Sequence, residues 1–361
     1  LGVKVGKYYA SEIDKFPISI TQKNYPNTIQ LGSVTDWQDW DIDWSSIDLV
    51  VGGFPCQSWS VAGLGLGDKD KRGMLFWTML DVMKKVLANN PQAKFLMENV
   101  RMKKEFEDYI TFHTEEALGK VNKHLINSAL VSAQNRKRFY WTNIDGIEQP
   151  EDQGLVLADI LMDGHVDRDK SYCLDANYFK GGNPKSYFEK GRRQLVFNRP
   201  CELKDFDSKA ECHHVATATD INGHDSIKRV YADSGKSPTL NTMSGGNREP
   251  KVLIVPEATK KGYTEIEDGD CFDATFPTSK TRRGRNMKFK SNCLTAANYE
   301  YMRYEHPTYR KLRPCECEAL QTFPIGYTEG ISNSQRYKCL GNSFTVSVIS
   351  HILSYAFRSN I

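Results

Sequence analysis

The chain has 361 residues, a length that predicts two domains or one large domain carrying an insertion. Hydrophobic residues make up 39% and charged residues 26%, which excludes a disordered, collagenous or coiled-coil chain. The net charge of +3 is too small to indicate a polyanionic partner by itself. No apolar run reaches the roughly 18 residues that span a bilayer, and the first residues lack the apolar core of a signal peptide. We therefore expect a soluble, cytoplasmic protein whose nine cysteines are reduced.

The first 145 residues alternate between apolar runs and helix-like stretches, as in a doubly wound α/β sheet. Residues 47–51 and 94–97 are apolar runs closed by glycine or polar residues, and both are predicted to be buried parallel strands. Between them, residues 74–87 carry apolar side chains at the spacing of an amphipathic crossover helix.

The character of the chain changes at about residue 151. From there to residue 306, short segments are broken by Gly, Pro, Asn and Asp, which predicts a loop-rich β domain. Residues 334–357 end the chain with an apolar run at helical spacing, and we expect this helix to return to the first domain. The predicted domains are therefore residues 1–150 with 330–361, and residues 151–329.

One segment of the second domain is strongly basic. Between Lys280 and Lys290 six of eleven residues are basic and none is acidic. The pattern is typical of a flexible phosphate-binding loop, and equally of a solvated surface loop. The basic residues are Lys280, Arg282, Arg283, Arg285, Lys288 and Lys290.

Ligands of open α/β sheets bind beyond the carboxyl ends of the strands. Pro55-Cys56-Gln57 follows the first predicted strand, and Glu98-Asn99-Val100 ends the second. A cysteine on a glycine-bounded turn is a candidate nucleophile, and a carboxyl group at the neighbouring strand end is a candidate proton donor. The alternative is that Cys56 is an ordinary buried thiol.

With these motifs the chain resembles the DNA (cytosine-5) methyltransferases of bacterial or phage type. The resemblance extends over nearly the whole sequence and preserves the order of the family's motifs. It implies a Rossmann-like methyltransferase domain that depends on S-adenosylmethionine, with a smaller, loop-rich β domain for target recognition over residues 151–329. The motifs are Pro55-Cys56-Gln57, Glu98-Asn99-Val100, Gln134-Asn135-Arg136-Lys137-Arg138, Arg310 to Pro324, and Gly341-Asn342-Ser343 heading the terminal helix.

The resemblance assigns catalytic roles to five residues. Cys56, held by Pro55, is implied to add as a thiolate to carbon 6 of cytosine, which makes carbon 5 nucleophilic. Glu98 is implied to stabilise, at N3, the negative charge that builds on the ring. Arg136 and Arg138 are candidates for holding the base oxygen and a nearby phosphate. The alternative for each arginine is a salt bridge at a strand edge.

Residues beside this group are implied to shape the cleft. Asn99 is expected to hold the active-site loop rather than to touch substrate. Gln57 and Ser58 begin a loop that is expected to close over DNA.

The implied methyl donor is S-adenosylmethionine. Glu12 is expected to bond ribose hydroxyls, with a surface carboxylate as the alternative. The family's Phe-x-Gly-x-Gly donor loop would lie roughly 20 residues before Glu12, so we expect it to be missing from the chain as given. Ser33 stands where the family usually has Asp, and Asp36 or backbone groups are expected to replace that contact. The predicted donor site comprises Glu12, Ile13, Ser33, Val34, Pro55, Leu75, Asn342 and Ser343.

Three similar segments recur in the predicted recognition domain, at residues 171–176, 237–242 and 291–296. Glycine pairs near the first two let a backbone approach another chain closely. We interpret residues 245–248 and 280–290 as loops that grip DNA, or else as hairpins of similar turn chemistry. The predicted DNA-binding residues are Gln57, Ser58, Gly245, Gly246, Asn247, Arg248, Arg282, Arg283 and Arg285.

No metal site is expected. Cysteine and histidine residues near positions 201–214 and at 315 and 317 lack the paired Cys-x-x-Cys spacing of a structural zinc site.

The favoured function is therefore DNA cytosine-5 methylation in a bacterial or phage modification system. The expected partner is double-stranded DNA. A restriction endonuclease would act separately, and the enzyme would be a monomer in the cytoplasm of a bacterial cell or a phage-infected host. Two alternatives stay open: a transfer-RNA cytosine methyltransferase on the same scaffold, and a catalytically silent DNA-binding homologue.

Overall fold

The structure is a computed structural model in which two compact units are distinguished, Leu1–Pro200 with Arg310–Ile361, and Cys201–Tyr309. The residues it describes are 3–55, 73–206, 214–217, 224, 228–231, 251–252, 254–266, 269–273, 281, 285–288, 290, 301–303 and 308–357.

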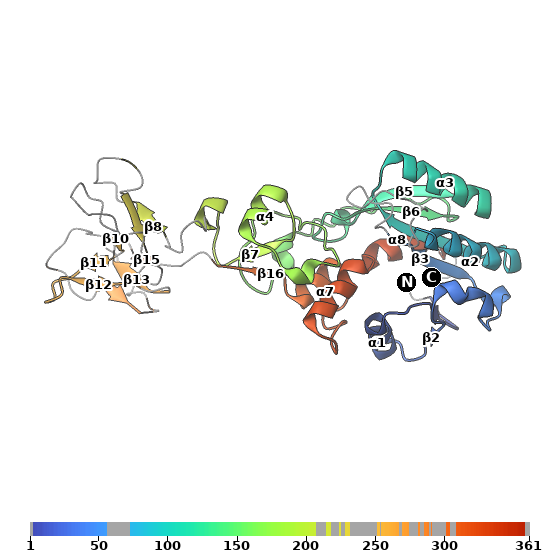
Figure 1. The fold of residues 1–361 in the computed structure, drawn as a ribbon, viewed down its shortest axis with the longest axis horizontal. Helices are drawn as coiled ribbons and strands as arrows, with labels where there is room; N and C mark the ends of the chain where they lie inside the picture. Colours follow the sequence, from blue (N-terminus) through green and yellow to red (C-terminus); the bar gives the residue numbers. More distant parts are fainter. Residues whose placement is uncertain are drawn as a thin grey trace. The chain divides into compact units, whose positions relative to one another are not determined.

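A four-stranded sheet in the order β3-β4-β6-β5 is the frame of the first unit (Figure 1). β3 (Leu49–Gly53) and β4 (Lys94–Val100) run parallel. β6 (Lys137–Thr142) lies between β4 and β5 (Asn122–Asn127) and is antiparallel to both. Because β6 runs against β4, its first residues lie beside the carboxyl end of β4, with Arg138 opposite Val100.

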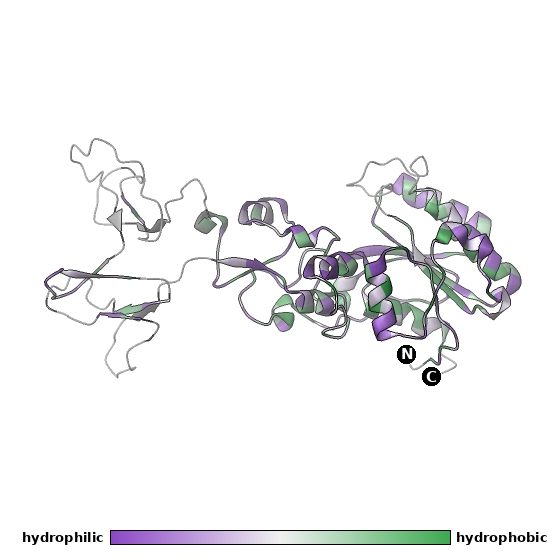
Figure 2. Cartoon of the chain, turned by 60° about the horizontal axis from the view of Figure 1, so that its bottom comes forward, coloured by the Kyte–Doolittle hydropathy of each residue, from purple (hydrophilic) through white to green (hydrophobic). Residues whose placement is uncertain are grey.

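Helices cover both faces of this sheet. α2 (Leu75–Asn89) and α3 (Lys104–Leu118) pack on one face, where Phe95, Met97 and Trp141 are buried. α8 (Val346–Ala356) packs on the other face, against Leu96 and Tyr140. Alternate residues of β4 thus serve two different cores, as the period of a strand requires. Figure 2 shows hydrophobic and hydrophilic residues alternating along the helices of this unit, as expected for helices with one buried side.

The predicted helix over residues 74–87 is confirmed as α2, and the burial of the second predicted strand is confirmed in β4. The prediction that the first strand is buried is wrong: Val51 of β3 is 37% exposed, and β3 lies at the edge of the four-stranded sheet. The terminal run returns to the first unit as predicted, but as two helices. Residues 341–343 lie at the junction between α7 (Asn333–Asn342) and α8 and do not head a single helix.

The N-terminal segment forms a separate two-stranded parallel sheet of β1 (Tyr9–Ala10) and β2 (Ile29–Gln30). Between them, α1 (Lys15–Asn24) begins at Asp14, whose side chain accepts a hydrogen bond from the backbone N–H of Phe16. Asp14 also pairs with Lys338 of α7 at 2.8 Å, which ties this segment to the C-terminal helices.

Residues 157–200 and 310–320 form a further layer of the first unit. It contains α4 (Pro184–Lys190), β7 (Leu195–Phe197) paired with β16 (Tyr309–Lys311), and α6 (Pro314–Leu320). Two carboxylates of α6 are buried. Glu316 pairs with Arg310, and Glu318 accepts hydrogen bonds from Thr328 and Arg336, so each charge is compensated as burial requires.

The described part of the second unit contains one short 3-10 helix, Leu203–Phe206, and otherwise short strands. The strands are β8 (His214–Thr217), β9 (Arg229–Tyr231), β10 (Lys251–Val252), β11 (Ile254–Pro256), β12 (Tyr263–Glu265), β13 (Cys271–Asp273), β14 (Asn286–Met287) and β15 (Tyr301–Arg303). Its β-rich character agrees with the sequence. Its limits differ from the predicted recognition domain, because residues 151–200 and 310–329 belong to the first unit. None of the described helices is long and apolar enough to cross a membrane.

Gly164 provides a test of the packing in the layer that contains β7. Its φ is +91°, and an added Cβ would lie 2.6 Å from Cγ1 of Val196 and 2.8 Å from the carbonyl oxygen of Phe197. We expect Gly164→Ala to lower the free energy of unfolding by about 2 to 4 kcal/mol, through backbone strain and steric clash together. Gly146→Ala is the matched control: its φ is +72° and nothing lies within 4 Å of its Cβ position. Urea unfolding should show a loss of only about 1 kcal/mol in the free energy of unfolding of the control. Equal losses in the two variants would contradict the packing described.

Candidate active site

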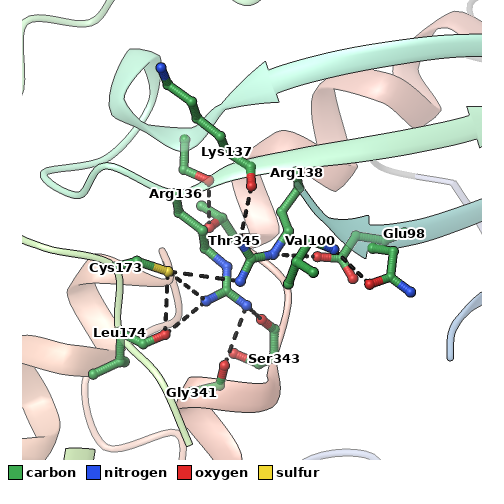
Figure 3. Close-up of polar contacts among 12 residues, drawn as sticks. Glu98, Val100, Arg136, Lys137, Arg138, Cys173, Leu174, Gly341, Ser343 and Thr345 are labelled. Atoms are coloured by element: carbon green, nitrogen blue, oxygen red, sulfur yellow. Dashed lines mark hydrogen bonds and ion pairs between the residues drawn. The ribbon is translucent and has the colours of Figure 1, made fainter. Parts of the chain in front are cut away.

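Glu98, near the end of β4, is the centre of the candidate active site (Figure 3). Its side chain is 14% exposed, and its Oε1 atom pairs with Nε of Arg138 at 2.9 Å. Gly53 of β3 lies opposite Glu98 in the parallel pair. A Cβ atom at Gly53 would lie 3.1 Å from the carbonyl oxygen of Glu98 and 3.4 Å from Oε2. A residue without a side chain therefore lets β3 approach Glu98, including the carboxylate oxygen that does not bond Arg138, this closely.

Arg138 stays charged in this setting. Its side chain is 13% exposed, and its Nη2 atom lies 3.8 Å from Sγ of Cys173. Burial lowers the pKa of Arg138, but the Cys173 sulfur and the Glu98 carboxylate raise it, and the net pKa lies above the ordinary value. A charge-assisted bond from a planar guanidinium fixes the direction of the partner carboxylate. Arg138 therefore orients Glu98.

Arg136 is placed differently from the sequence expectation. Its side chain is 4% exposed, and its guanidinium donates to the carbonyl oxygens of Leu174 at 2.9 Å, Ser343 at 2.8 Å and Gly341 at 3.3 Å (Figure 3). Burial lowers the pKa of Arg136, and the nearby charge of Arg138 lowers it further. The geometry does not support the predicted contact of Arg136 with base or phosphate, because the guanidinium bonds the protein's own backbone.

Asn99 holds the segment that leads to the predicted nucleophile. Its Nδ2 atom donates to the carbonyl oxygen of Phe54 at 3.2 Å, and the Phe54 ring packs against Phe76 at 5.1 Å between centroids. This contact agrees with the role expected for Asn99. Pro55 follows directly and is half-buried. The predicted nucleophile Cys56, and Gln57 and Ser58 after it, lie outside the described residues, so their roles stay predictions.

Glu12, the predicted ribose-binding residue, follows β1 directly. Its Oε1 atom accepts hydrogen bonds from the backbone N–H groups of Ile13 at 2.7 Å and Asp14 at 2.8 Å. These bonds orient the carboxylate and leave Oε2 without a hydrogen bond to any residue that the structure describes. Ile13 is 77% exposed. An oriented carboxylate with an open acceptor is suited to a ribose hydroxyl.

Ser33 follows β2, the strand paired with β1, and therefore lies at the same sheet edge as Glu12. Its hydroxyl accepts a hydrogen bond from the N–H of Thr35 and caps the short helix that begins at Val34. Asp36, the suggested replacement for the family's acidic residue, is exposed. Leu75 is half-buried at the start of α2.

Asn342 and Ser343 line a cavity of about 430 Å³ between the α7–α8 junction and α8. The Ser343 hydroxyl donates to the carbonyl oxygen of Leu340, and the wall is otherwise largely apolar. The remaining lining residues are Phe323, Phe344, Val346, Ile349, Ser350 and Leu353.

Of the predicted DNA-gripping residues, only Arg285 is described. It is 2% exposed, and its guanidinium donates to the carbonyl oxygens of Asp273 and Pro256. The expectation that Arg285 contacts phosphate does not agree with this burial: the arginine fastens strands of the second unit to one another. Gly245, Gly246, Asn247, Arg248, Arg282 and Arg283 lie outside the described residues.

Cys173 is the site residue that sequence reasoning missed. It is exposed, and its sulfur lies 3.6 Å from Nη1 of Arg136 as well as 3.8 Å from Nη2 of Arg138. One weak signal was present, since Cys173 belongs to the first of the three similar segments. Nothing in that spacing links the segment to the two arginines. Within the described part of the chain, no group of three metal-ligating side chains occurs.

The fold has a mixed sheet with helices on both faces, and Glu98 pairs with Arg138 beside the strand that leads to Pro55 and Cys56. This arrangement is the frame of a cytosine-5 methyltransferase. The sequence model for C-5 cytosine-specific DNA methylases matches residues 2–358. The chain therefore belongs to the C-5 cytosine-specific DNA methylase family, whose reaction is methyl transfer to carbon 5 of cytosine in DNA.

Two curated relatives agree with this membership. The chain is 28% identical to the orphan methyltransferase M.SPBetaI of Bacillus phage SPbeta, over 95% of this chain and 90% of the relative. It is 36% identical to the type II methyltransferase M1.ScrFI of Lactococcus lactis subsp. cremoris, over 72% of this chain and 75% of the relative. Among solved structures, a mutant of Spodoptera frugiperda DNMT2 matches with a TM-score of 0.49 and 17% identity, covering 97% of this chain and 91% of that one.

The close approach of β3 to Glu98 can be tested with two adjacent glycines. A Cβ at Gly53 meets Glu98, whereas a Cβ at Gly52 meets only the flexible Met79 side chain, with Sδ at 3.0 Å. We expect Gly53→Ala to lower turnover by at least about tenfold, because a displaced carboxylate loses its alignment. Gly52→Ala should lower stability slightly and leave turnover within about twofold. Turnover numbers on cytosine-containing DNA, with melting temperatures alongside, decide the matter; equal turnover in both variants would refute the assignment.

Proposed function

We propose that this protein transfers a methyl group from S-adenosylmethionine to carbon 5 of a flipped-out cytosine, in a specific double-stranded DNA sequence, through a covalent adduct with Cys56. The observation that carries the proposal is the Glu98–Arg138 pair, fixed at 2.9 Å where the backbone of Gly53 approaches Glu98 closely. Gly53 ends β3, the strand that leads into Pro55 and Cys56.

Groups at the ends of β3 and β4 carry out different parts of the reaction. The Cys56 thiolate adds to carbon 6 of cytosine, and negative charge develops on the ring. Arg138 holds Oε1 of Glu98, so the other oxygen, Oε2, is the one that faces N3 of the base. There Glu98, acting as a carboxylic acid, donates the hydrogen bond that stabilises this charge. After methylation the proton on carbon 5 is lost and the thiolate leaves carbon 6, which restores the aromatic ring.

S-adenosylmethionine supplies an electrophilic methyl group when bound. Glu12 would bond the ribose hydroxyls through Oε2, and Ile13, Ser33, Val34, Pro55 and Leu75 would line the same site. Asn342 and Ser343 would hold the donor from the α7–α8 junction, where they already border a cavity of about 430 Å³. The oriented Glu12 carboxylate and this cavity support the assignment.

A cytosine inside a duplex shows neither face of carbon 6 to a thiolate, so the base must be extruded before the reaction. We propose that Gln57, Ser58 and the loop of Gly245 to Arg248 fill the space the base leaves, and that Arg282 and Arg283 bind phosphates. Residues 151–329 would serve target recognition. We propose a monomer in the cytoplasm of a bacterial cell or phage-infected host. A separately acting restriction endonuclease fits relatives described as type II methyltransferases.

Covalent trapping tests the nucleophile. Fluorine at carbon 5 cannot leave as a proton does, so the adduct with DNA containing 5-fluorocytosine should persist. Cys56→Ser should abolish both this denaturation-resistant adduct and methyl transfer. Cys315→Ser, a matched change on α6, should retain both. An adduct formed by Cys56→Ser would show that another residue is the nucleophile.

The phosphate-binding loop is tested by salt dependence. Replacing Arg282 and Arg283 with Gln should weaken binding to all DNA sequences alike and reduce the salt slope by about 1.8, or roughly 0.9 for each phosphate that is no longer neutralised. Arg285→Gln is the control, because its guanidinium bonds backbone carbonyls and its removal should reduce stability without changing the slope. Affinity measured from 50 to about 200 mM salt distinguishes the cases. If the salt slope changes only in Arg285→Gln, then Arg285 binds phosphate and Arg282 and Arg283 do not.

A further inference from the structure

Arg136 presents a buried charge that the proposed chemistry does not use. Its three short hydrogen bonds all go to backbone carbonyl oxygens, of Leu174, Gly341 and Ser343. No carboxylate pairs with it among the residues that the structure describes. Burying a cation is costly unless it is fully hydrogen-bonded, so these carbonyls must stay in place for the charge to be tolerated.

The three carbonyls belong to two segments that touch one another. Leu174 lies in the segment after Cys173, and Gly341 and Ser343 lie at the α7–α8 junction proposed to bind the methyl donor. A Cβ atom at Gly341 would lie 2.3 Å from the carbonyl carbon and oxygen of Asp175. The backbones of the two segments therefore meet at a distance that only glycine permits, and the Arg136 guanidinium bonds both segments.

The backbone of Arg136 is tied to the same junction by a second route. Its carbonyl oxygen accepts from the N–H of Ser128 at 3.0 Å. The Ser128 hydroxyl bonds that of Thr345 at 2.9 Å, and the Thr345 hydroxyl bonds Oε1 of Gln321 at 2.9 Å. Thr345 is the residue from which α8 begins. Hydrogen bonds thus link both the side chain and the main chain of Arg136 to the α7–α8 junction.

Arg136 is also joined to the Glu98 pair. Arg136 directly precedes β6, and Arg138 is the second residue of that strand. The Cys173 sulfur touches both guanidinium groups, at 3.6 Å and 3.8 Å, and Arg138 in turn pairs with Glu98 (Figure 3). A shift of residues 173–174 would therefore reach the arginine that orients Glu98.

We propose that Arg136 is a positioning residue that couples the donor-binding junction, Gly341 to Ser343, to the Arg138–Glu98 pair, and that it contacts neither base nor phosphate. Donor bound at the junction holds the Arg136 carbonyls in place, and through Cys173 it fixes Arg138 against Glu98. The inference rests on the proposed function for the roles of the junction and of Glu98. It adds that the donor prepares the cytosine site before DNA arrives.

The test compares Arg136→Lys with wild type. Lysine keeps the charge, but its ammonium on a flexible stem cannot reproduce the rigid fork. We expect the dissociation constant for S-adenosylhomocysteine, measured by calorimetry without DNA, to rise at least about tenfold, the scale on which one charge-assisted bond contributes. We also expect the donor KM to rise, kcat to fall and DNA affinity to stay within about twofold.

Lys170→Gln provides the matched control. Its ammonium also donates to three backbone carbonyls, of Ala129, Ser132 and Leu155, but none of these belongs to the donor junction. The control should be less thermally stable and keep its affinity for S-adenosylhomocysteine. If Arg136→Lys keeps donor affinity, or lowers DNA affinity instead, the proposal is wrong.

A second measurement needs no variant. Iodoacetamide alkylation of Cys173, mapped by peptide mass spectrometry, reports on the contact between residues 173–174 and the two arginines. Saturating S-adenosylhomocysteine should slow this alkylation several-fold in wild type and leave Cys315 unchanged; Arg136→Lys should lack that dependence even at saturation. An unchanged Cys173 rate in wild type overturns the coupling. Failure of wild type to bind S-adenosylhomocysteine or form the 5-fluorocytosine adduct would instead overturn the proposed function.

Discussion

Arg136 directly precedes β6 and Arg138 is the second residue of that strand, and within the described residues one carboxylate, that of Glu98, pairs with either arginine. Two cations so close repel each other, and burial adds to the cost of both. In the structure the Glu98 carboxylate pairs with Arg138, and backbone carbonyl oxygens accept hydrogen bonds from Arg136. The positions of residues 173–174 and of the α7–α8 junction follow from that division.

The constraint exists because β6 is antiparallel to β4. A parallel strand in its place would put its first residues at the opposite end of the sheet, away from Glu98. The antiparallel register sets Arg138 opposite Val100 and Tyr140 opposite Glu98, so the arginine reaches the carboxylate diagonally. Burial raises the pKa of Tyr140, and the charge of Glu98 raises it further. The phenol therefore stays neutral and adds no charge beside Glu98 and Arg138.

The sequence predicted what depends on local periodicity. Residues 74–87 and 94–97 have strong helical and strand patterns because their apolar side chains face cores made by near neighbours in the chain. The exposure of Val51 was missed, since an apolar run has the same pattern at an edge and in the middle of a sheet. The burial of Arg136 and of Arg285 was also missed. A basic residue is interpreted as a surface or ligand-binding group unless its carbonyl partners are known, and those of Arg136 lie at Leu174 and beyond Leu340.

The motifs, by contrast, located the chemistry but not its geometry. Glu98 and Arg138 were assigned from short sequence matches, and the ion pair between them is what the structure adds. Gly53 illustrates the difference: the sequence marks it as the close of a strand, whereas the structure shows that its lack of a side chain permits the close approach to Glu98. Asn99, on the opposite face of β4 from Glu98, fixes Phe54. One tripeptide thus orients the carboxylate on one side of the sheet and anchors the approach to Cys56 on the other. This is a physical reason for Glu and Asn to be adjacent: a strand presents consecutive side chains to opposite faces, and this site needs one on each.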